Sequence, residues 1–490
     1  MKRATTFVHE WYSELTTYER RTLWIALVLT FVTRTIFVAS SLIHHPVAIE
    51  VDTYRYFAIA NEPGFARWFD LNDPAGYPIL IKLCLSTLTS YAGILILQAL
   101  LSTATIGLLF IAGRKFLVPK WNRVALLAAS LSALSMFFSS QLMTETSFCF
   151  FFTLSAVILF CSAGTKPSGW LLFLAGLSLS FATLIRPSSM VTIMFLSPLL
   201  IYYVYDKAMS MRNAAAFISG ALLLIGLYAL GLKIKYNYFG VSVKGPTTLS
   251  IYYGIPIMQS AGYSQHYIDS TIAALPVAEQ YLDHTRADHI DGETFAHKHN
   301  ALFLQLVKSH PLDVVKVHFL GLAQMLAWPP AGLFQLSKHF GALPADQSLK
   351  EMEFQNIFGP LVRFHFREVI DILRDRLHST PAIILFFWLI STLAWMILLP
   401  LSLIGLIVML RSCITGVLPF QYVLLLAIIF SYLLLIPHVA AGARFRMPIE
   451  PLLLLCSMAG LQRMLAWKRK TMLHATMQSP LRKKVIGLRA

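Results

Sequence analysis

The sequence predicts an all-α integral membrane protein with about ten transmembrane helices, interfacial helices in the first outer loop and one larger outer-face region. Of its 490 residues, 57% are hydrophobic and 13% are charged, whereas soluble domains average about 45–50% apolar and about 25% charged residues. The mean hydropathy is +0.64, and apolar runs of roughly 20 residues, the length that crosses a bilayer, recur along the chain. These observations exclude a soluble globular domain.

The ten expected spans are the apolar runs that approach this length. They lie at about 22–43, 91–113, 124–141, 147–163, 169–185, 188–205, 214–235, 382–410, 419–437 and 447–466. The rest of the chain divides around them. We expect a transmembrane core at 1–235, a periplasmic region at 236–380, and C-terminal helices with a basic cytoplasmic tail at 381–490.

The formal net charge of +16 is explained by membrane topology. Lysine and arginine mark the cytoplasmic side of membrane proteins, and here they gather on one side if the ten spans alternate. Both termini are then inside, the loop at 44–78 is outside, and no nucleic-acid partner is needed to account for the charge. The basic positions are Lys2, Arg3, Arg20, Arg21, Arg114, Lys115, Lys120, Arg123, Lys207, Arg212 and the tail from Lys468 to Arg489.

The first outer loop, 44–78, is the leading candidate for an active site. Five of the 24 acids in the chain fall within it. Asp52 and Asp73 stand where short helices should begin: Asp52 precedes a stretch that places Tyr54 and Phe57 on one helical face, and Asp73 precedes Pro74, a favoured first helical residue. An interfacial helix is expected next, at 79–90.

Further charged residues stand at the ends of spans or inside them. Arg34 lies well inside span one, either snorkelling outward or facing an anionic ligand. Glu145 opens span four, where an acid complements the helix dipole. Arg186 precedes a proline and therefore stands at a break. Arg444 and Arg446 lie between the last two spans.

The region 236–380 is polar and rich in tyrosine and histidine. His297 and His299 are two residues apart, which places them on different faces of a helix and disfavours a shared metal. The stretch 314–336 is apolar, and we expect an interfacial or re-entrant helix, because a crossing there would leave the basic tail outside.

Under this topology the outer face collects acids and arginines from separate loops and helix ends. The planar guanidinium suits phosphate, and a carboxylate can take a proton from an attacking hydroxyl. Chemistry on a lipid-linked phosphate follows as a hypothesis. The residues concerned are Asp52, Asp73, Glu145, Arg186, Arg444 and Arg446.

Several short motifs, taken together in their order along the chain, resemble those of the bacterial protein-mannosyltransferase-like and aminoarabinose-transferase-like members of the C-type glycosyltransferases (GT-C). The resemblance covers spans one to seven and the last two. It is carried by D-x-Y (Asp52, Tyr54), PAGYP (Pro74 to Pro78), TET (Thr144 to Thr146), IRP (Ile185 to Pro187) and RFRMPIEP (Arg444 to Pro451).

The resemblance implies transfer of a sugar from a polyprenyl-phosphate donor to a lipid, glycan or protein acceptor at the outer face of a bacterial inner membrane. By the same resemblance, Asp52 is the general base or orients the acceptor, and Arg186 with the Arg444 and Arg446 pair holds the donor phosphate. Thr53 stands where the family often has a second acid. No cofactor is therefore expected firmly, and a divalent metal stays an open alternative.

The main alternative from another class is a secondary transporter or a flippase-like protein for a lipid-linked or anionic substrate. Transporters place ionisable groups near the membrane midplane, between paired broken spans. In this sequence nearly all charge is expected at the ends of the spans, which favours the enzyme.

Overall fold

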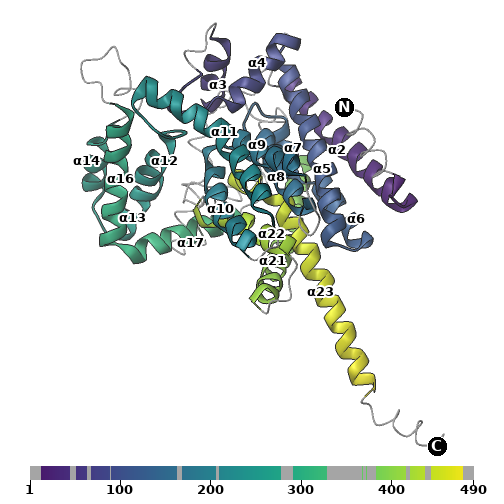
Figure 1. The fold of residues 1–490 in the computed structure, drawn as a ribbon. Helices are drawn as coiled ribbons and strands as arrows, with labels where there is room; N and C mark the ends of the chain where they lie inside the picture. Colours follow the sequence, from purple (N-terminus) through teal and green to yellow (C-terminus); the bar gives the residue numbers. More distant parts are fainter. Residues whose placement is uncertain are drawn as a thin grey trace, which may run out of the picture.

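The computed structural model describes residues 13–44, 51–62, 68–88, 90–162, 168–205, 209–276, 291–327, 367, 371, 382–414, 420–435 and 443–477. Every regular element in these ranges is a helix (Figure 1). Six of the helices are long and apolar enough to cross a membrane, and a bent helix pair brings the total to seven if it counts as one span. The expectation of a multi-pass, all-helical membrane protein is confirmed.

The six long apolar helices match six of the expected spans, although their ends differ by a few residues. A further expected span, the one at about 124–141, corresponds to the bent pair of α6 (Pro119–Ser130) and α7 (Ala133–Ser139), whose axes differ by 45°. The six are α2 (Thr17–His44), α5 (Ala92–Phe116), α8 (Glu145–Ser162), α10 (Met190–Tyr205) with the 3-10 turn η1 (Pro187–Ser189), α11 (Met211–Tyr236) and α21 (Ala382–Ile414).

The three remaining expected spans correspond to α9 (Gly169–Ile185), α22 (Phe420–Leu435) and α23 (Glu450–Met477). The first two are apolar but shorter than a typical span. α23 leaves the bundle as a long straight helix (Figure 1). The number of ten spans therefore stays a prediction.

The bend between α6 (Pro119–Ser130) and α7 (Ala133–Ser139) has a visible cause. The side chain of Ser132 caps α7 by accepting a bond from the backbone N–H of Ser135. Arg34 donates to the carbonyl oxygens of Ala129 and Ser130 at the end of α6. These groups satisfy the helix ends that a break exposes, so the chain turns inside the bundle without leaving buried backbone groups unpaired there.

Glycines allow α9 and α11 to pack closely. A Cβ on Gly176 would overlap the carbonyl oxygen of Phe217, and a Cβ on Gly220 would overlap that of Phe173. Small residues that let backbones approach are typical of helix interfaces in membranes. This contact fixes the position of α9, and with it the position of Arg186, the residue that follows its last turn.

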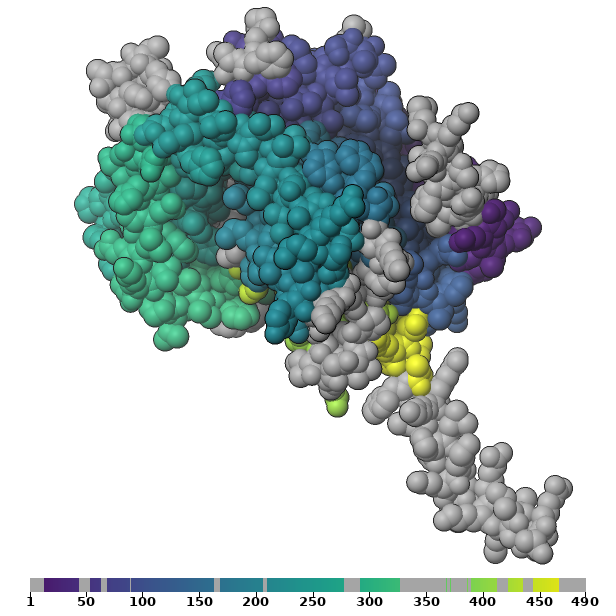
Figure 2. All heavy atoms as spheres, in the orientation of Figure 1, coloured from purple at the N-terminus to yellow at the C-terminus, as the bar shows by residue number. Residues whose placement is uncertain are grey.

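After α11 the chain forms a lobe beside the bundle, shown in green in Figure 2. The lobe has a small core of its own, formed by Tyr253, Ile257, Met258, Ile268, Leu306 and Val317. Its helices are α12 (Lys244–Thr247), the π-helical turn η2 (Thr248–Tyr253), α13 (Gly254–Ser260), α14 (Gln265–Ala273), α16 (Gly292–Ser309) and α17 (Pro311–Ala327).

His299 belongs to the interior of this lobe. Its Nδ1 lies 2.6 Å from the hydroxyl oxygen of Ser250, and its Nε2 lies 2.9 Å from the carbonyl oxygen of Pro276. Burial lowers the pKa of His299. With both ring nitrogens engaged by protein groups, His299 is a buried structural residue.

The expected interfacial helix at 314–336 corresponds in its first part to α17. α17 is not among the helices of the described chain that are long and apolar enough to cross a membrane. Residues 328–336 lie outside the described residues, so the end of this segment stays a prediction.

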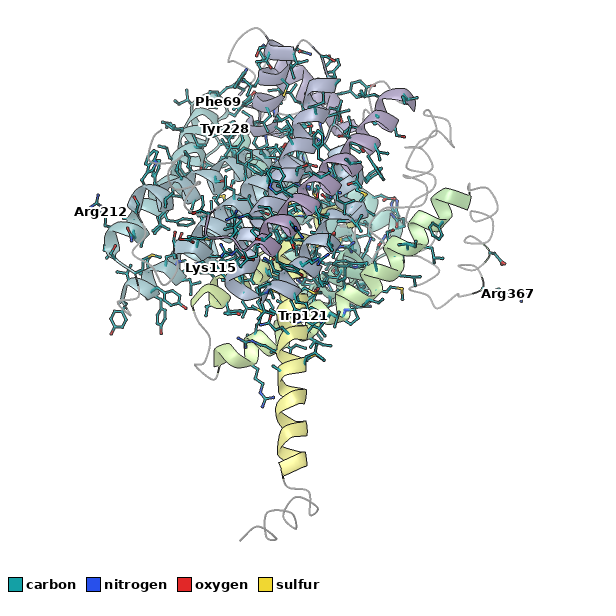
Figure 3. All side chains as sticks on the ribbon, turned by 90° about the vertical axis from the view of Figure 1, so that its right-hand side faces the viewer. Phe69, Lys115, Trp121, Arg212, Tyr228 and Arg367 are labelled. Atoms are coloured by element: carbon teal, nitrogen blue, oxygen red, sulfur yellow. The ribbon has the colours of Figure 1, made fainter. Side chains whose placement is uncertain are left out.

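The two ends of the bundle carry different contacts. At one end, Tyr228 on α11 exchanges bonds with the backbone of Asp70 in the first loop. At the other end, Arg114 on α5 pairs with Glu19 on α2 at 3.0 Å. Figure 3 shows the same polarity, with Phe69 and Tyr228 near one end and Lys115 and Trp121 toward the opposite end.

Candidate active site at the first-loop end of the bundle

Glu145, Arg186 and Arg444 form one cluster. The Oε1 atom of Glu145 accepts from Nη1 of Arg186 at 2.8 Å and is also paired with Nε of Arg444. The guanidinium of Arg186 lies 4.9 Å from the ring centroid of Phe445. The structure thus brings together three of the residues that the sequence singled out, from the start of α8, the end of α9 and the 3-10 turn η4 (Ala443–Phe445).

Burial and charge distinguish the members of this cluster. The side chain of Glu145 is fully buried, whereas those of Arg186 and Arg444 are 12% and 32% exposed. Two arginines face one carboxylate, so the cluster carries one net positive charge at its exposed side. Guanidinium groups held in this way suit a phosphate or carboxylate ligand, because they can donate two parallel hydrogen bonds to it.

The backbone around Arg186 explains how the side chain reaches this position. Pro187 disfavours helical conformation at the residue before it, and Arg186 adopts extended backbone angles with φ −143° and ψ 115°. The chain therefore leaves α9 at Arg186 and turns at once into η1. The break that the sequence predicts is present.

In the first loop, Asp73 is buried between two cations. Its Oδ2 lies 3.2 Å from Nε of Arg55, and its Oδ1 is paired with Nζ of Lys244 in the lobe. The carboxylate thereby ties the loop to the segment that follows α11. The expectation that Asp73 and Pro74 begin a helix is wrong, because α4 (Gly76–Leu88) begins two residues after Pro74.

Asp70 shapes this part of the loop. Its Oδ1 accepts from the backbone N–H groups of Asn72 and Asp73, both at 2.8 Å, which is the turn that aspartate side chains favour. Burial raises the pKa of the Asp70 carboxyl above its ordinary value of 3.8. This turn includes Asn72 and Asp73, the two residues directly before Pro74, so no helix begins at Pro74.

Helix α3 (Val51–Asn61) confirms the helix expected after Asp52, which is its second residue. The side chain of Asp52 lies outside the described side chains. Tyr54 is 64% exposed, while Phe57 is buried and makes an edge contact with Tyr91 at 4.5 Å. Tyr54 and Phe57 lie three residues apart on α3, as expected for one helical face, but they differ in burial.

The first loop is docked against the end of α9. A Cβ on Gly76 would overlap the backbone of Leu184 and Ile185, so only glycine allows this approach. Tyr77 next to it is fully buried and donates to Gln98 at 2.7 Å. The first loop, with Asp52 and Asp73, therefore lies at the same end of the bundle as Ile185, the residue that precedes Arg186.

Arg34 and Arg446, two further residues expected to bind the donor phosphate, are fully buried. Arg34 donates to Ser102 at 3.2 Å as well as to the end of α6. Nη1 of Arg446 donates to the carbonyl oxygens of Met325 and Leu326. Both guanidinium groups are directed at protein atoms, which favours a structural role for them over the expected contact with a donor phosphate.

A small cavity is lined mainly by apolar side chains, together with several hydroxyl groups and Glu450, a residue that the sequence analysis missed. Ser132 donates to Oε1 of Glu450, and the hydroxyl of Thr146 faces this space without a hydrogen-bond partner. Glu450 stands four residues after Arg446 and pairs with it. That spacing on a helix was the available signal for it.

Lys244 and Arg55 were also missed, and for Lys244 no local signal exists. It lies 171 residues from Asp73 in the sequence. Among the described residues, no group of three histidine, cysteine, aspartate or glutamate side chains could hold a metal ion.

The sequence matches no protein-family model and no curated protein. The structure is similar to the crystal structure of the Archaeoglobus fulgidus oligosaccharyltransferase in its apo form, with a TM-score of 0.51 and 11% identity. The match covers 95% of this chain and 52% of the archaeal one, so the chain spans about half the length of that enzyme.

An archaeal oligosaccharyltransferase from the same organism, in complex with an inhibitory peptide and a dolichol-phosphate, matches with a TM-score of 0.45 and 10% identity over 94% of this chain and 51% of that one. At such identities the likeness concerns the fold. The structure is similar in fold to about half of the archaeal oligosaccharyltransferase.

Proposed function

We propose that this chain is a membrane glycosyltransferase that moves a sugar from a polyprenyl-phosphate-linked donor to a lipid, glycan or protein acceptor at the outer face of a bacterial inner membrane. The observation that carries the proposal is the pair Arg186 and Arg444, held by the buried Glu145. It offers net positive charge and planar donors at the end of the bundle where the first loop docks.

In this proposal the acceptor oxygen attacks the anomeric carbon of the donor sugar, and the bond from that carbon to the phosphate oxygen breaks. Arg186 and Arg444 stabilise the charge that develops on the departing phosphate, which is the kind of preorganised electrostatic help that contributes most to such reactions. Asp52 accepts the proton that the acceptor hydroxyl loses. No step is routed through a metal.

The fold likeness to the archaeal oligosaccharyltransferase supports this assignment. The sequence motifs independently resemble those of C-type glycosyltransferases. We propose that the chain is of the protein-mannosyltransferase-like or aminoarabinose-transferase-like branch and that it uses a polyprenyl phosphate. In this proposal Asp73 holds the loop through its two ion pairs.

The test is Arg186→Lys in the purified full-length protein. Lysine keeps the positive charge but cannot make the two-pronged contact, so the donor KM should rise by about 10-fold or more, equivalent to the roughly 1.4 kcal/mol or more of a lost charge-assisted hydrogen bond. Gly226→Ala, at a position with open space around it, serves as a control for expression and folding. Unchanged KM and turnover in Arg186→Lys would remove the phosphate role.

The assay also separates the enzyme from a transporter or flippase-like protein. Labelled polyprenyl-phosphate sugar is supplied in detergent, with a mixture of lipid and glycan acceptors. An enzyme needs no membrane gradient and should release the lipid phosphate there. Binding of the donor without release, together with gradient-dependent movement of the same lipid in vesicles, would favour the transporter.

A further inference from the structure

Arg446 lies where the lobe meets the bundle. Its Nη1 donates to the carbonyl oxygens of Met325 at 3.0 Å and Leu326 at 2.9 Å. Both carbonyls belong to the last turn of α17, where backbone acceptors have no partner inside the helix. A cation at this end of a helix is also favoured by the helix dipole. Arg446 thus caps the last helix of the lobe.

Two other elements hold the same guanidinium. Its central carbon lies 3.8 Å from the ring centroid of Trp395 on α21, and Trp395 Nε1 itself donates to Leu326 O. Nε of Arg446 lies 3.5 Å from Glu450 on α23. The side chain is fully buried, so these contacts fix it firmly.

Arg446 and Arg444 are joined by a single residue, Phe445. The ring of Phe445 lies against the guanidinium of Arg186, and Arg444 is paired with Glu145. A displacement of Arg446 therefore moves both the backbone that carries Arg444 and the ring beside Arg186. Misplacement of a substrate-positioning group by about 1 Å can reduce a rate by about 100-fold.

We propose that Arg446 is a positioning residue, which fixes Arg444 in the candidate site by anchoring its turn to the end of α17, so that the lobe sets the geometry of the donor-phosphate pair. This inference rests on the proposed function for its effect on the donor. The anchoring itself is independent of what the site binds.

The chain offers a matched control in Arg34. It too is fully buried and donates to two carbonyls in the last turn of a helix, in this case α6. Arg34 lies on α2, however, and its bonds lead to α5 and α6 rather than to the turn of Arg444. Arg446→Lys and Arg34→Lys remove similar chemistry from two different junctions.

The first measurement needs no enzyme activity. Full-length protein in lipid nanodiscs is treated with phenylglyoxal, which modifies exposed guanidinium groups, and the rate at Arg444 is followed by mass spectrometry. Arg446→Lys should raise this rate by about 3-fold or more, because the turn that carries Arg444 loses its anchor and Arg444 becomes more exposed. Arg34→Lys should leave the modification rate at Arg444 within about 2-fold of that in the unmodified protein, although it should lower the melting temperature about as much as Arg446→Lys does. Equal rates at Arg444 in the two variants overturn the proposal.

Trp395→Phe replaces Arg446→Lys if that variant does not fold. Phenylalanine keeps a ring beside Arg446 but loses the bond to Leu326, so the end of α17 loosens. Arg444 should again become more reactive. An unchanged rate in a folded Trp395→Phe protein counts against the anchoring.

The second measurement is a double-mutant cycle on the donor KM. If Arg446 acts through Arg444, the factor by which Arg446→Lys raises the donor KM should be at least about 2-fold smaller in an Arg444→Ala background than in the unmodified protein. Arg34→Lys should instead raise KM by the same factor in both backgrounds. Additive behaviour of Arg446 overturns the positioning role. If Arg444→Ala alone leaves KM unchanged, the proposed donor site fails, while the reactivity of Arg444 still tests the anchor.

Discussion

Asp52 is the residue on which the proposed proton transfer depends. Asparagine at this position in the first turn of α3 keeps the shape of the side chain, and the loss of a charge near the helix dipole costs about 0.3–1 kcal/mol. Asp52→Asn should therefore fold normally, while turnover falls by about 100-fold or more, because a positioned base typically contributes 10² to 10⁴. Turnover and melting temperature of the purified variant are the measurements.

Asp73→Asn gives the contrasting outcome. Asparagine leaves Lys244 and Arg55 without their carboxylate, so the melting temperature should fall. The loss should be smaller than the roughly 3–5 kcal/mol of a fully buried pair, because both cations are more than one-third exposed. If Asp52→Asn keeps full turnover and a folded Asp73→Asn loses it, Asp73 is the proton acceptor instead.

Asp70 predicts a pH dependence of stability. Its carboxyl has a pKa raised by burial, so the folded state favours the protonated form. This contribution to stability is present below the ordinary pKa of 3.8 and is lost as the pH rises through the higher folded pKa. Asparagine can accept the same two backbone bonds without a charge. Asp70→Asn should therefore reduce the fall of the melting temperature as the pH rises above the ordinary pKa of 3.8. A profile equal to that of the unmodified protein would show that Asp70 does not cause the dependence.

The residues of the candidate site differ in how far the sequence revealed them. Arg186 and Glu145 were found because a proline break and a helix start mark them locally. Arg34 and Arg446 were placed at the phosphate because charge alone does not tell a ligand from a helix cap. Lys244 escaped notice because its partner Asp73 is close only in the folded chain.

At the scale of elements, the seam between α9 and α11 provides a test of packing. A methyl group at Gly220 would overlap the carbonyl oxygen of Phe173, whereas a methyl group at Gly226 on the same helix meets nothing within 4 Å. Gly220→Ala should separate the helices and lower the melting temperature in detergent. Gly226→Ala should be neutral or raise it, since alanine is favoured over glycine in a helix interior by about 1 kcal/mol. Equal effects would mean that close approach does not hold the seam.

Apolar length predicted these helices well, because the bilayer sets it. It did not predict where they break. The bend between α6 and α7 depends on Arg34, almost a hundred residues earlier in the chain, and the start of α4 depends on the turn that Asp70 forms. Both are long-range or side-chain effects that a hydropathy pattern does not contain.

At the scale of the whole molecule, contacts divide the helix ends into two groups. One end of the bundle holds the first loop, the ends of α9 and α11, the start of α8 and the turn η4. The opposite end joins Arg114 to Glu19, Arg123 to Tyr18, Val118 to Gln462 and Phe116 to Tyr422. The positive-inside rule predicts that this second end, which carries Arg114 and Arg123, faces the cytoplasm.

This division predicts that α6 and α7 together form one broken crossing, and the ten expected spans further require that α9, α22 and α23 cross as well. The chain enters α6 beside Val118 at the basic end and enters α8 at Glu145, at the end of the first loop. Only a crossing between them connects these two positions. If the bent pair were re-entrant, Glu145 and Asp70 would lie on opposite sides of the membrane.

Reporter fusions test this arrangement directly. Alkaline phosphatase, which is active only outside, and green fluorescent protein, which is fluorescent only inside, are fused after Val118 and after Gln141, on either side of the bent pair. A second set follows Ser379 and Thr415, which flank α21 and lie outside the described residues. We expect fluorescence at Val118 and Thr415 and phosphatase activity at Gln141 and Ser379. The same signal on both sides of the bent pair would divide the cluster of Glu145, Arg186 and Arg444 from the first loop, and the proposed active site could not form.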